Sequence, residues 1–246
     1  TNTGGDVSYV GTAYTFGVAG YNGQLWTWGD NRNGGLGHNN TTRYSSPVQV
    51  PGTTWRTYSA SYEYTSFATK TDGTLWAWGY NQYGALAQNS NHDEGIASYS
   101  SPVQIPGTTW NNFIARHHSG GAATRTDGTL WTWGRNQYGQ LGVPSAGVTD
   151  RSSPVQVPGT TWSDGSISQT TAAVIKTDGT MWSWGQNAQG NLGLNQAPAQ
   201  LAYSSSPVQI PGTSWSKATM GPYRRGAATR TDGTLWVWGY NNYGQL

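Results

Sequence analysis

Two adjacent histidines and one acidic pair are the residues in this sequence that most resemble metal ligands. His117 and His118 could bind a metal, but neighbouring side chains on a strand point in opposite directions, and no acidic residue lies close to them in sequence. Asp93 and Glu94 could hold calcium with nearby asparagines, yet their segment lacks the regular Asp spacing and the glycine of a calcium loop. We therefore predict no metal site and no bound cofactor.

Catalytic side chains form no recognisable pattern either. Cysteine is absent, and neither a Ser-His-Asp order nor a close pair of carboxylates stands out. The 14 tryptophans could stack on sugars or absorb light, but ten stand in repeated pairs and four follow Pro-Gly turns. Repeated positions favour core packing, because a specialised site would differ from one repeat to the next. We predict a non-enzymatic protein.

Five copies of a Trp-x-Trp phrase organise the chain. The first Trp of each copy stands at 26, 76, 131, 182 and 236, so the steps are 50, 55, 51 and 54 residues. A period of about fifty residues is typical of repeat architectures. The paired tryptophans that we expect in the core are Trp26, Trp28, Trp76, Trp78, Trp131, Trp133, Trp182, Trp184, Trp236 and Trp238.

One repeat predicts four short antiparallel strands. In the third copy they cover residues 102–106, 110–115, 122–125 and 129–133. Prolines at both ends of the first strand remove ladder donors and confine it to a sheet edge. The segment Thr126-Asp127-Gly128 has the sequence of a hairpin turn, with Asp127 as a turn former. Such strands repeated around an axis predict an all-β propeller of four-stranded antiparallel blades, with a β-solenoid as the alternative.

The repeats divide the chain into five units of a single propeller domain or propeller fragment. They cover approximately residues 1–46, 47–101, 102–153, 154–206 and 207–246. The last unit stops inside its motif and lacks a Pro-Val-Gln strand after its Trp-x-Trp phrase. We expect part of a longer protein, with a complete five-bladed ring that lacks one edge strand as the alternative.

The phrase T-D-G-T-L-W-x-W-G-x-N-x-x-G-Q-L-G stands almost complete at Thr126–Gly142, and less completely at Thr71–Ala87, Thr177–Gly193 and Thr231–Leu246. It resembles the repeat of the regulator of chromosome condensation family, and the resemblance covers the whole chain. It implies a propeller, generally of seven blades, and its founding member exchanges nucleotide on a small GTPase. The family's common Gly-x-x-His element is missing here, and the Gly- and Asn-rich style resembles bacterial and bacteriophage versions of the repeat.

Variation is confined to one loop and one turn of each repeat. Length varies in residues 30–46, 80–101, 135–153 and 186–206, and repeat proteins gather such insertions on one face, often the binding face. Side-chain chemistry varies in the turn before the third strand, where residue types enriched at binding hot spots occur. The predicted binding residues are Tyr14, Tyr62, Glu63, Tyr64, Arg116, His117, His118, Tyr223, Arg224 and Arg225.

Composition narrows the class of partner. The net charge is +2, and Arg224-Arg225 is the densest basic pair, so we do not expect nucleic acid as a partner. No apolar run reaches the roughly eighteen residues of a membrane span. Few lysines and glutamates with much Gly, Asn, Thr and Trp predict a virion, extracellular or cell-surface module that binds a protein or glycan surface, alone or in a larger assembly. The alternatives are a regulatory scaffold of the guanine-nucleotide-exchange kind and a carbohydrate-binding propeller.

Overall fold

The computed structural model describes residues 9–12, 15–60, 64–90, 97–114, 120–221, 224–244 and 246. Within these ranges the strands form five antiparallel sheets, four with four strands and the last with three. The predicted all-β fold with four-stranded antiparallel blades is confirmed.

Each sheet is a meander of strands consecutive in sequence. The first sheet contains β1 (Tyr9–Thr12), β2 (Phe16–Tyr21), β3 (Gln24–Gly29) and β4 (Tyr44–Gln49). The second contains β5 (Trp55–Ala60), β6 (Thr65–Lys70), β7 (Leu75–Tyr80) and β8 (Ser98–Ile105). The third contains β9 (Trp110–Phe113), β10 (Gly120–Arg125), β11 (Leu130–Gly134) and β12 (Arg151–Gln156). The fourth contains β13 (Trp162–Ile167), β14 (Thr171–Lys176), β15 (Met181–Gln186) and β16 (Tyr203–Ile210). The fifth contains β17 (Trp215–Gly221), β18 (Arg225–Arg230) and β19 (Leu235–Gly239), and two short 3-10 turns, η1 (Gln82–Gly84) and η3 (Pro144–Ala146), lie in long loops.

The strand with the Pro-Val-Gln sequence belongs to a different sheet from the one that the sequence unit suggests. Gln104 lies opposite Trp76, and Gln156 lies opposite Trp131. The strand therefore closes the sheet of the preceding Trp-x-Trp strand instead of opening the next one, because the long loop folds back into an antiparallel pair. It is still an edge strand, as its prolines require. The Pro-Gly segment that follows it is the connection between sheets.

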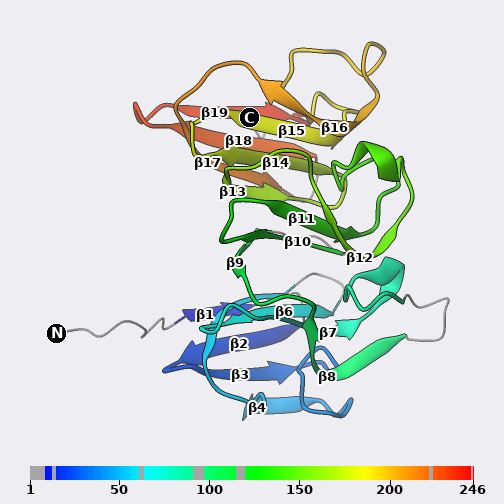
Figure 1. The fold of residues 1–246 in the computed structure, drawn as a ribbon, viewed down its shortest axis with the longest axis vertical. Helices are drawn as coiled ribbons and strands as arrows, with labels where there is room; N and C mark the ends of the chain where they lie inside the picture. The colour runs from blue at the N-terminus through cyan, green and yellow to red at the C-terminus, as the bar shows by residue number, and fades with distance from the viewer. Residues whose placement is uncertain are drawn as a thin grey trace.

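The sheets succeed one another along the molecule. The first and last sheets lie at opposite ends of the long axis in Figure 1, so the five sheets do not close into a five-bladed ring. The first strand of each later sheet packs against the second strand of the sheet before it: β5 on β2, β9 on β6, β13 on β10 and β17 on β14. Apolar cores lie between neighbouring sheets and join strands from both.

In the second to fifth sheets the second tryptophan of each pair joins neighbouring sheets. Trp133 is fully buried, and its Nε1 donates to the Ala85 carbonyl in the loop of the preceding sheet at 2.9 Å. The same bond recurs from Trp78 to Gly35 at 2.9 Å, from Trp184 to Gln140 at 2.8 Å and from Trp238 to Asn191 at 2.8 Å. The core position predicted for this tryptophan thus has a specific use as a link between sheets.

In the second to fifth sheets the first tryptophan of each pair lies under a cation. Lys70 Nζ is 4.6 Å from the Trp55 ring centroid and 4.4 Å from that of Trp76. Arg125 lies in the same way between Trp110 and Trp131, at 4.6 and 4.0 Å. The corresponding groups in the last two sheets are Lys176 with Trp162 and Trp182, and Arg230 with Trp215 and Trp236. These cation–π contacts cover the indole faces at one end of these four sheets.

Trp236 departs from the predicted core position, since it is 48 % exposed. Its strand β19 is the outer strand of a three-stranded sheet, and no later sheet packs against it among the described residues. The predicted turn role of Asp127 agrees with the geometry: its Oδ1 accepts hydrogen bonds from the Thr129 N–H at 2.9 Å and hydroxyl at 2.6 Å. These bonds hold the pKa of Asp127 below its usual value.

Candidate functional site

The described parts of the variable loops and of the predicted binding turns lie at the same end of the sheets. In the second sheet β6 and β7 are antiparallel, with Thr65 opposite Gly79, so the turn before β6 and the loop after β7 meet. The Thr-Asp-Gly turns lie at the opposite end, beyond the pair Thr69 and Leu75. We define the loop face as the end that carries the described residues among 30–45, 80–99, 135–151, 186–203 and 240–246, together with the described residues that immediately precede or begin β2, β6, β10, β14 and β18.

Three of the ten predicted binding residues lie within the described residues, and all three are on the loop face. Tyr64 immediately precedes β6, Arg224 immediately precedes β18, and Arg225 is its first residue. The other seven lie outside the described residues: Tyr14, Tyr62, Glu63, Arg116, His117, His118 and Tyr223.

Tyr64 has a backbone conformation that is unusual for its residue type. Its φ is +65°, and Arg224 at the equivalent position in the last sheet has φ +61°. The left-handed region costs a residue with a Cβ about 1–2 kcal/mol, and glycine takes it freely. The Tyr64 hydroxyl accepts a hydrogen bond from Arg32 Nη2 at 2.9 Å, and the Arg32 guanidinium is 5.6 Å from the ring centroid. A large side chain held at such a backbone cost suggests that the side chain has a use.

A charged cluster lies beside Tyr64. Asp30 is paired with Arg32 at 2.6 Å and with Arg43 at 3.2 Å. Both arginine side chains are exposed, at 59 % and 66 %, whereas that of Asp30 is 11 % exposed. Burial raises the pKa of Asp30, but hydrogen bonds from Arg32 and the charges of both arginines outweigh it and hold that pKa below its usual value. Sequence reasoning missed this cluster, although all three residues belong to one variable loop.

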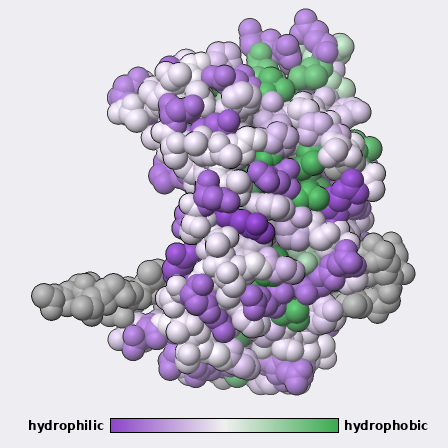
Figure 2. Space-filling view, viewed as in Figure 1, coloured by the Kyte–Doolittle hydropathy of each residue, from purple (hydrophilic) through white to green (hydrophobic). Residues whose placement is uncertain are grey.

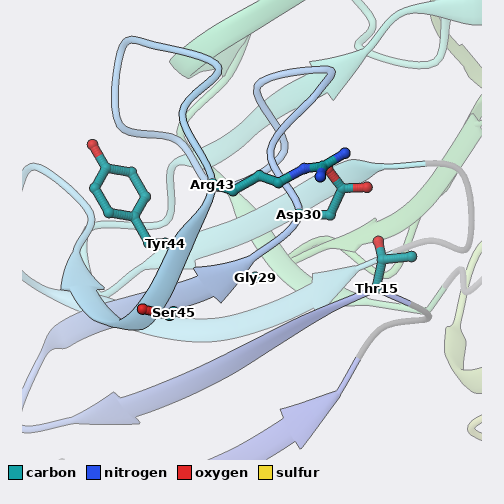
Figure 3. Close-up of a pocket in the computed structure, with 6 residues that line it drawn as sticks. All are labelled: Thr15, Gly29, Asp30, Arg43, Tyr44 and Ser45. Carbon is teal, nitrogen blue, oxygen red and sulfur yellow. The ribbon is translucent and has the colours of Figure 1, made fainter.

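A shallow open hollow of about 570 Å³ adjoins the cluster (Figure 3). Its lining residues are Thr15, Gly29, Asp30, Arg43, Tyr44 and Ser45. Figure 3 shows the Arg43 side chain extended toward Asp30, while the Tyr44 ring points away from this pair. The hollow offers a cation and hydroxyl groups, and no nucleophile there is paired with a general base.

Loops of neighbouring sheets also contact each other through arginine and tyrosine. The Arg135 guanidinium of the third sheet lies 4.7 Å from the ring centroid of Tyr83 in the second sheet. With Arg32 of the first sheet against Tyr64, this places an arginine from each neighbour on a tyrosine of the second sheet. The side shown in Figure 2 is mostly hydrophilic, with hydrophobic residues in separate groups.

A buried asparagine holds each long loop. Asn136 is fully buried; its Oδ1 accepts from the Leu141 N–H at 3.0 Å, and its Nδ2 donates to the Gly147 and Thr149 carbonyls at 3.0 and 3.2 Å. Asn31, Asn81 and Asn187 are buried in the same position and bind the equivalent N–H groups. The sequence marked this asparagine only as part of a loop. Its side chain replaces regular backbone pairing and gives the variable loops a fixed base.

His38 lies at the base of the first long loop. Thr27 Oγ1 donates to the Leu36 carbonyl at 2.7 Å, so at 3.0 Å from the ring the same oxygen accepts from His38 Nε2. Burial lowers the pKa of His38, and contacts with Thr27 and Gln49 oppose the shift only in part. In the second sheet Gln88 takes this position and donates to two backbone carbonyls.

Acidification is expected to destabilise the protein through His38. Because its folded-state pKa lies below the unfolded value of about 6.5, the unfolded chain binds more protons, and stability falls as the pH drops below that value. The His38→Gln variant, which copies Gln88, should lose less melting temperature between about pH 7.5 and pH 5 than the wild type. Equal losses in thermal melts at both pH values would show that His38 does not titrate in this way.

Neither a metal site nor a membrane-spanning helix occurs within the described ranges. No group of three His, Cys, Asp or Glu side chains there is placed to hold a metal ion. The described residues contain no helix of the length and apolar character needed to cross a membrane.

Comparison with known protein families shows to which family the chain belongs. The Regulator of chromosome condensation (RCC1) repeat matches residues 22–67, 72–122, 127–171 and 178–222. The chain belongs to the RCC1 repeat family. The resemblance inferred from the Trp-x-Trp phrases is thereby confirmed.

Curated RCC1-repeat relatives match parts of the chain. The Arabidopsis thaliana ultraviolet-B receptor UVR8 is 32% identical over 134 residues, which are 50% of this chain and 28% of the receptor. Human protein RCC2 is 33% identical over 93 residues, or 34% of this chain and 17% of that protein. The chain thus spans less than a third of the length of either relative.

Solved structures match the RCC1-repeat fold over nearly the whole chain. Human WBSCR16 gives a TM-score of 0.78 at 21% identity and covers 96% of this chain and 63% of its own. Yeast RCC1 (Prp20), solved bound to Kap60, gives 0.78 at 17% identity and covers 95% and 56%. At these identities the likeness supports the propeller fold alone.

The predicted virion or cell-surface location is wrong. The RCC1-repeat relatives are intracellular regulators: a plant ultraviolet-B receptor, RCC2 proteins and yeast RCC1. They come from plant, frog, human and yeast, and none supports a bacteriophage character. The prediction of location from composition failed because many Gly and Asn residues lie in the turns and loop bases of the repeat. Their abundance therefore carries no information on location.

Proposed function

We propose that this RCC1-repeat chain is a non-enzymatic regulatory scaffold that binds a protein partner through its loop face. The observation that carries the proposal is Tyr64, an aromatic side chain kept in the left-handed region and set against Arg32 of the neighbouring sheet. Tyrosine and arginine are enriched at interface hot spots. The buried asparagines hold the base of each loop, so the loops lose less conformational entropy when a partner binds.

Relatives of the same fold support a protein partner over a small ligand. Solved structures of yeast RCC1 concern its complex with Kap60 and its binding to Gsp1p and histones. The hollow beside Asp30 is shallow and open, whereas small-molecule sites bury most of their ligand.

Replacing Tyr64 with glycine is expected to separate binding from stability. Glycine removes the ring and relieves the left-handed backbone, so the free energy of unfolding should change by less than about 1 kcal/mol. Loss of a hot-spot tyrosine should weaken partner binding by roughly tenfold or more. The measurement is affinity capture from a lysate of the source organism with mass spectrometry, followed by titration of the captured protein.

Tyr21→Ala is the matched control, because Tyr21 is 61 % exposed at the opposite end of the sheets. The proposal requires a set of proteins that the wild type and Tyr21→Ala retain and that Tyr64→Gly loses. Retention of the same proteins by Tyr64→Gly would contradict a loop-face site.

A more specific form of this function is nucleotide exchange on a small GTPase, as the family resemblance implies. Its support is the fold shared with yeast RCC1, for which binding to Gsp1p is described. Release of a fluorescent guanine nucleotide from purified Gsp1p should then be faster in the presence of the chain. An unchanged release rate would remove the exchange role and leave the scaffold proposal standing.

A further inference from the structure

Charged side chains divide unequally between the two ends of the sheets. Away from the loop face the described residues carry six cations and five anions, a net charge of +1 (6 − 5): Arg56, Lys70, Arg125, Lys176, Lys217 and Arg230 with Asp72, Asp127, Asp164, Asp178 and Asp232. On the described part of the loop face six arginines and two aspartates leave a net charge of +4 (6 − 2): Arg32, Arg43, Arg135, Arg151, Arg224 and Arg225 with Asp30 and Asp150. Among the described residues the loop face is the more cationic end.

The residue type of these cations is informative. Every cation on the described loop face is arginine, although the chain uses lysine at equivalent places elsewhere, as Lys70 and Arg125 show. The planar guanidinium pairs with a carboxylate through two parallel hydrogen bonds and stacks on aromatic rings. Arg32 and Arg135 already show such stacking, on Tyr64 and Tyr83.

Asp30 orients two arginines and leaves part of their bonding capacity open. Arg43 contacts the carboxylate through Nε at 3.2 Å, and its two Nη nitrogens have no hydrogen-bond partner among the described residues. Arg32 is fixed by Asp30 on one side and by the Tyr64 hydroxyl on the other. Two positive charges share one negative charge, and Arg43 borders the hollow together with Ser45.

We propose that the cluster of Arg32, Asp30 and Arg43 binds carboxylate side chains of an acidic protein segment. This inference rests on the proposed function and adds the class of partner. A carboxylate of the segment pairs with the Nη edge of Arg43 at the hollow. The Tyr64 ring supplies an adjoining aromatic contact. Asp30 accepts hydrogen bonds from both guanidinium groups, does not touch the partner, and opposes an approaching carboxylate with its own negative charge.

Nucleic acid fits this face less well than an acidic protein segment. Affinity for duplex DNA rises with the number of phosphates neutralised, one every few ångströms along the backbone. The described arginines instead occur as pairs on the first, third and fifth sheets, and Asp30 lies inside one pair, where it would repel a continuous phosphate chain. Separate carboxylates match separate arginine pairs.

The test uses a fluorescein-labelled peptide of Glu-Ser-Glu-Gly repeats, about twenty residues long, at low ionic strength, where surface charges are least screened. The wild-type chain should bind it, and the same peptide with Gln in place of Glu should not bind. The double variant Arg32→Gln, Arg43→Gln should weaken binding roughly tenfold. Asp30→Asn should strengthen it, because the negative charge is removed while an acceptor for the Arg32 N–H remains.

Lys217→Gln is the control for charge, since it removes one positive charge from an exposed pair with Asp164 away from the loop face. No binding of the Glu peptide, equal binding of the Gln peptide, an unaffected double variant, weaker binding by Asp30→Asn, or tighter binding of duplex DNA would each overturn the proposal. If the peptide fails to bind but Tyr64→Gly still loses captured proteins, only the acidic class is wrong. If the peptide binds and Tyr64→Gly loses nothing, the wider scaffold function is wrong.

Discussion

Replacing Trp133 with phenylalanine is expected to lower the free energy of unfolding by about 2–4 kcal/mol. The substitution removes a buried hydrogen bond to the Ala85 carbonyl and leaves that carbonyl without a partner. It also leaves a space where the larger indole packed between two sheets. Urea denaturation followed by far-ultraviolet circular dichroism measures the loss.

Trp110→Phe in the same sheet is the matched control. Trp110 is 1 % exposed, so the change in volume is comparable, but its Nε1 has no hydrogen-bond partner among the described residues. We expect it to cost about 1–3 kcal/mol less than Trp133→Phe, the difference being the bond and the orphaned carbonyl. Equal losses in the two variants would show that the bond between sheets adds nothing to stability.

Asn136→Ala is expected to cost about 3 kcal/mol, because it leaves the buried Leu141 N–H and two loop carbonyls without their partner. Hydrogen exchange should speed up across residues 136–149, while strands of distant sheets keep their protection. Urea denaturation gives the energy and mass spectrometry of exchanged peptides gives the location.

Asn241→Ala tests whether burial is the cause of that loss. Asn241 is the equivalent residue in the last repeat, where it is exposed and accepts one bond from the Leu246 N–H at 3.1 Å. Its replacement should stay within about 0.5 kcal/mol, as is usual for surface positions. A loss as large as that of Asn136→Ala would mean that the side chain acts through local turn formation alone.

Local patterns in the sequence were enough to predict most strands of this RCC1-repeat chain. The proline-flanked strand was correctly placed at an edge, and Asp127 was correctly identified as a turn former, because both depend on neighbouring backbone groups. The partner sheet of the proline-flanked strand was not predictable in the same way. It depends on whether a long loop folds back or crosses over, and no short-range pattern encodes that choice.

The candidate site was likewise predictable in its local features and not in its long-range contacts. The loop that contains Asp30, Arg32 and Arg43 was predicted to lie on a variable face, since its length differs between repeats. The charged cluster itself depends on side chains up to thirteen residues apart, and the contact of Arg32 with Tyr64 spans thirty-two. Such contacts come from the packing of adjacent sheets. The location of the protein was predicted wrongly because composition was taken to report on environment when it reflected the repeat.

The offset between sequence unit and sheet has a consequence for how such a protein gains and loses repeats. A unit that begins with its Pro-Val-Gln strand gives that strand to one sheet and its other strands to the next. A duplicated or deleted stretch of the gene that respects the sequence period therefore leaves every sheet complete, because each incoming unit finishes its neighbour. The same overlap ties adjacent sheets together covalently, so the unravelling of one exposes the edge of another and unfolding spreads along the array. Whole units can thus be gained or lost without leaving a sheet short of a strand, while each array still melts as a connected body.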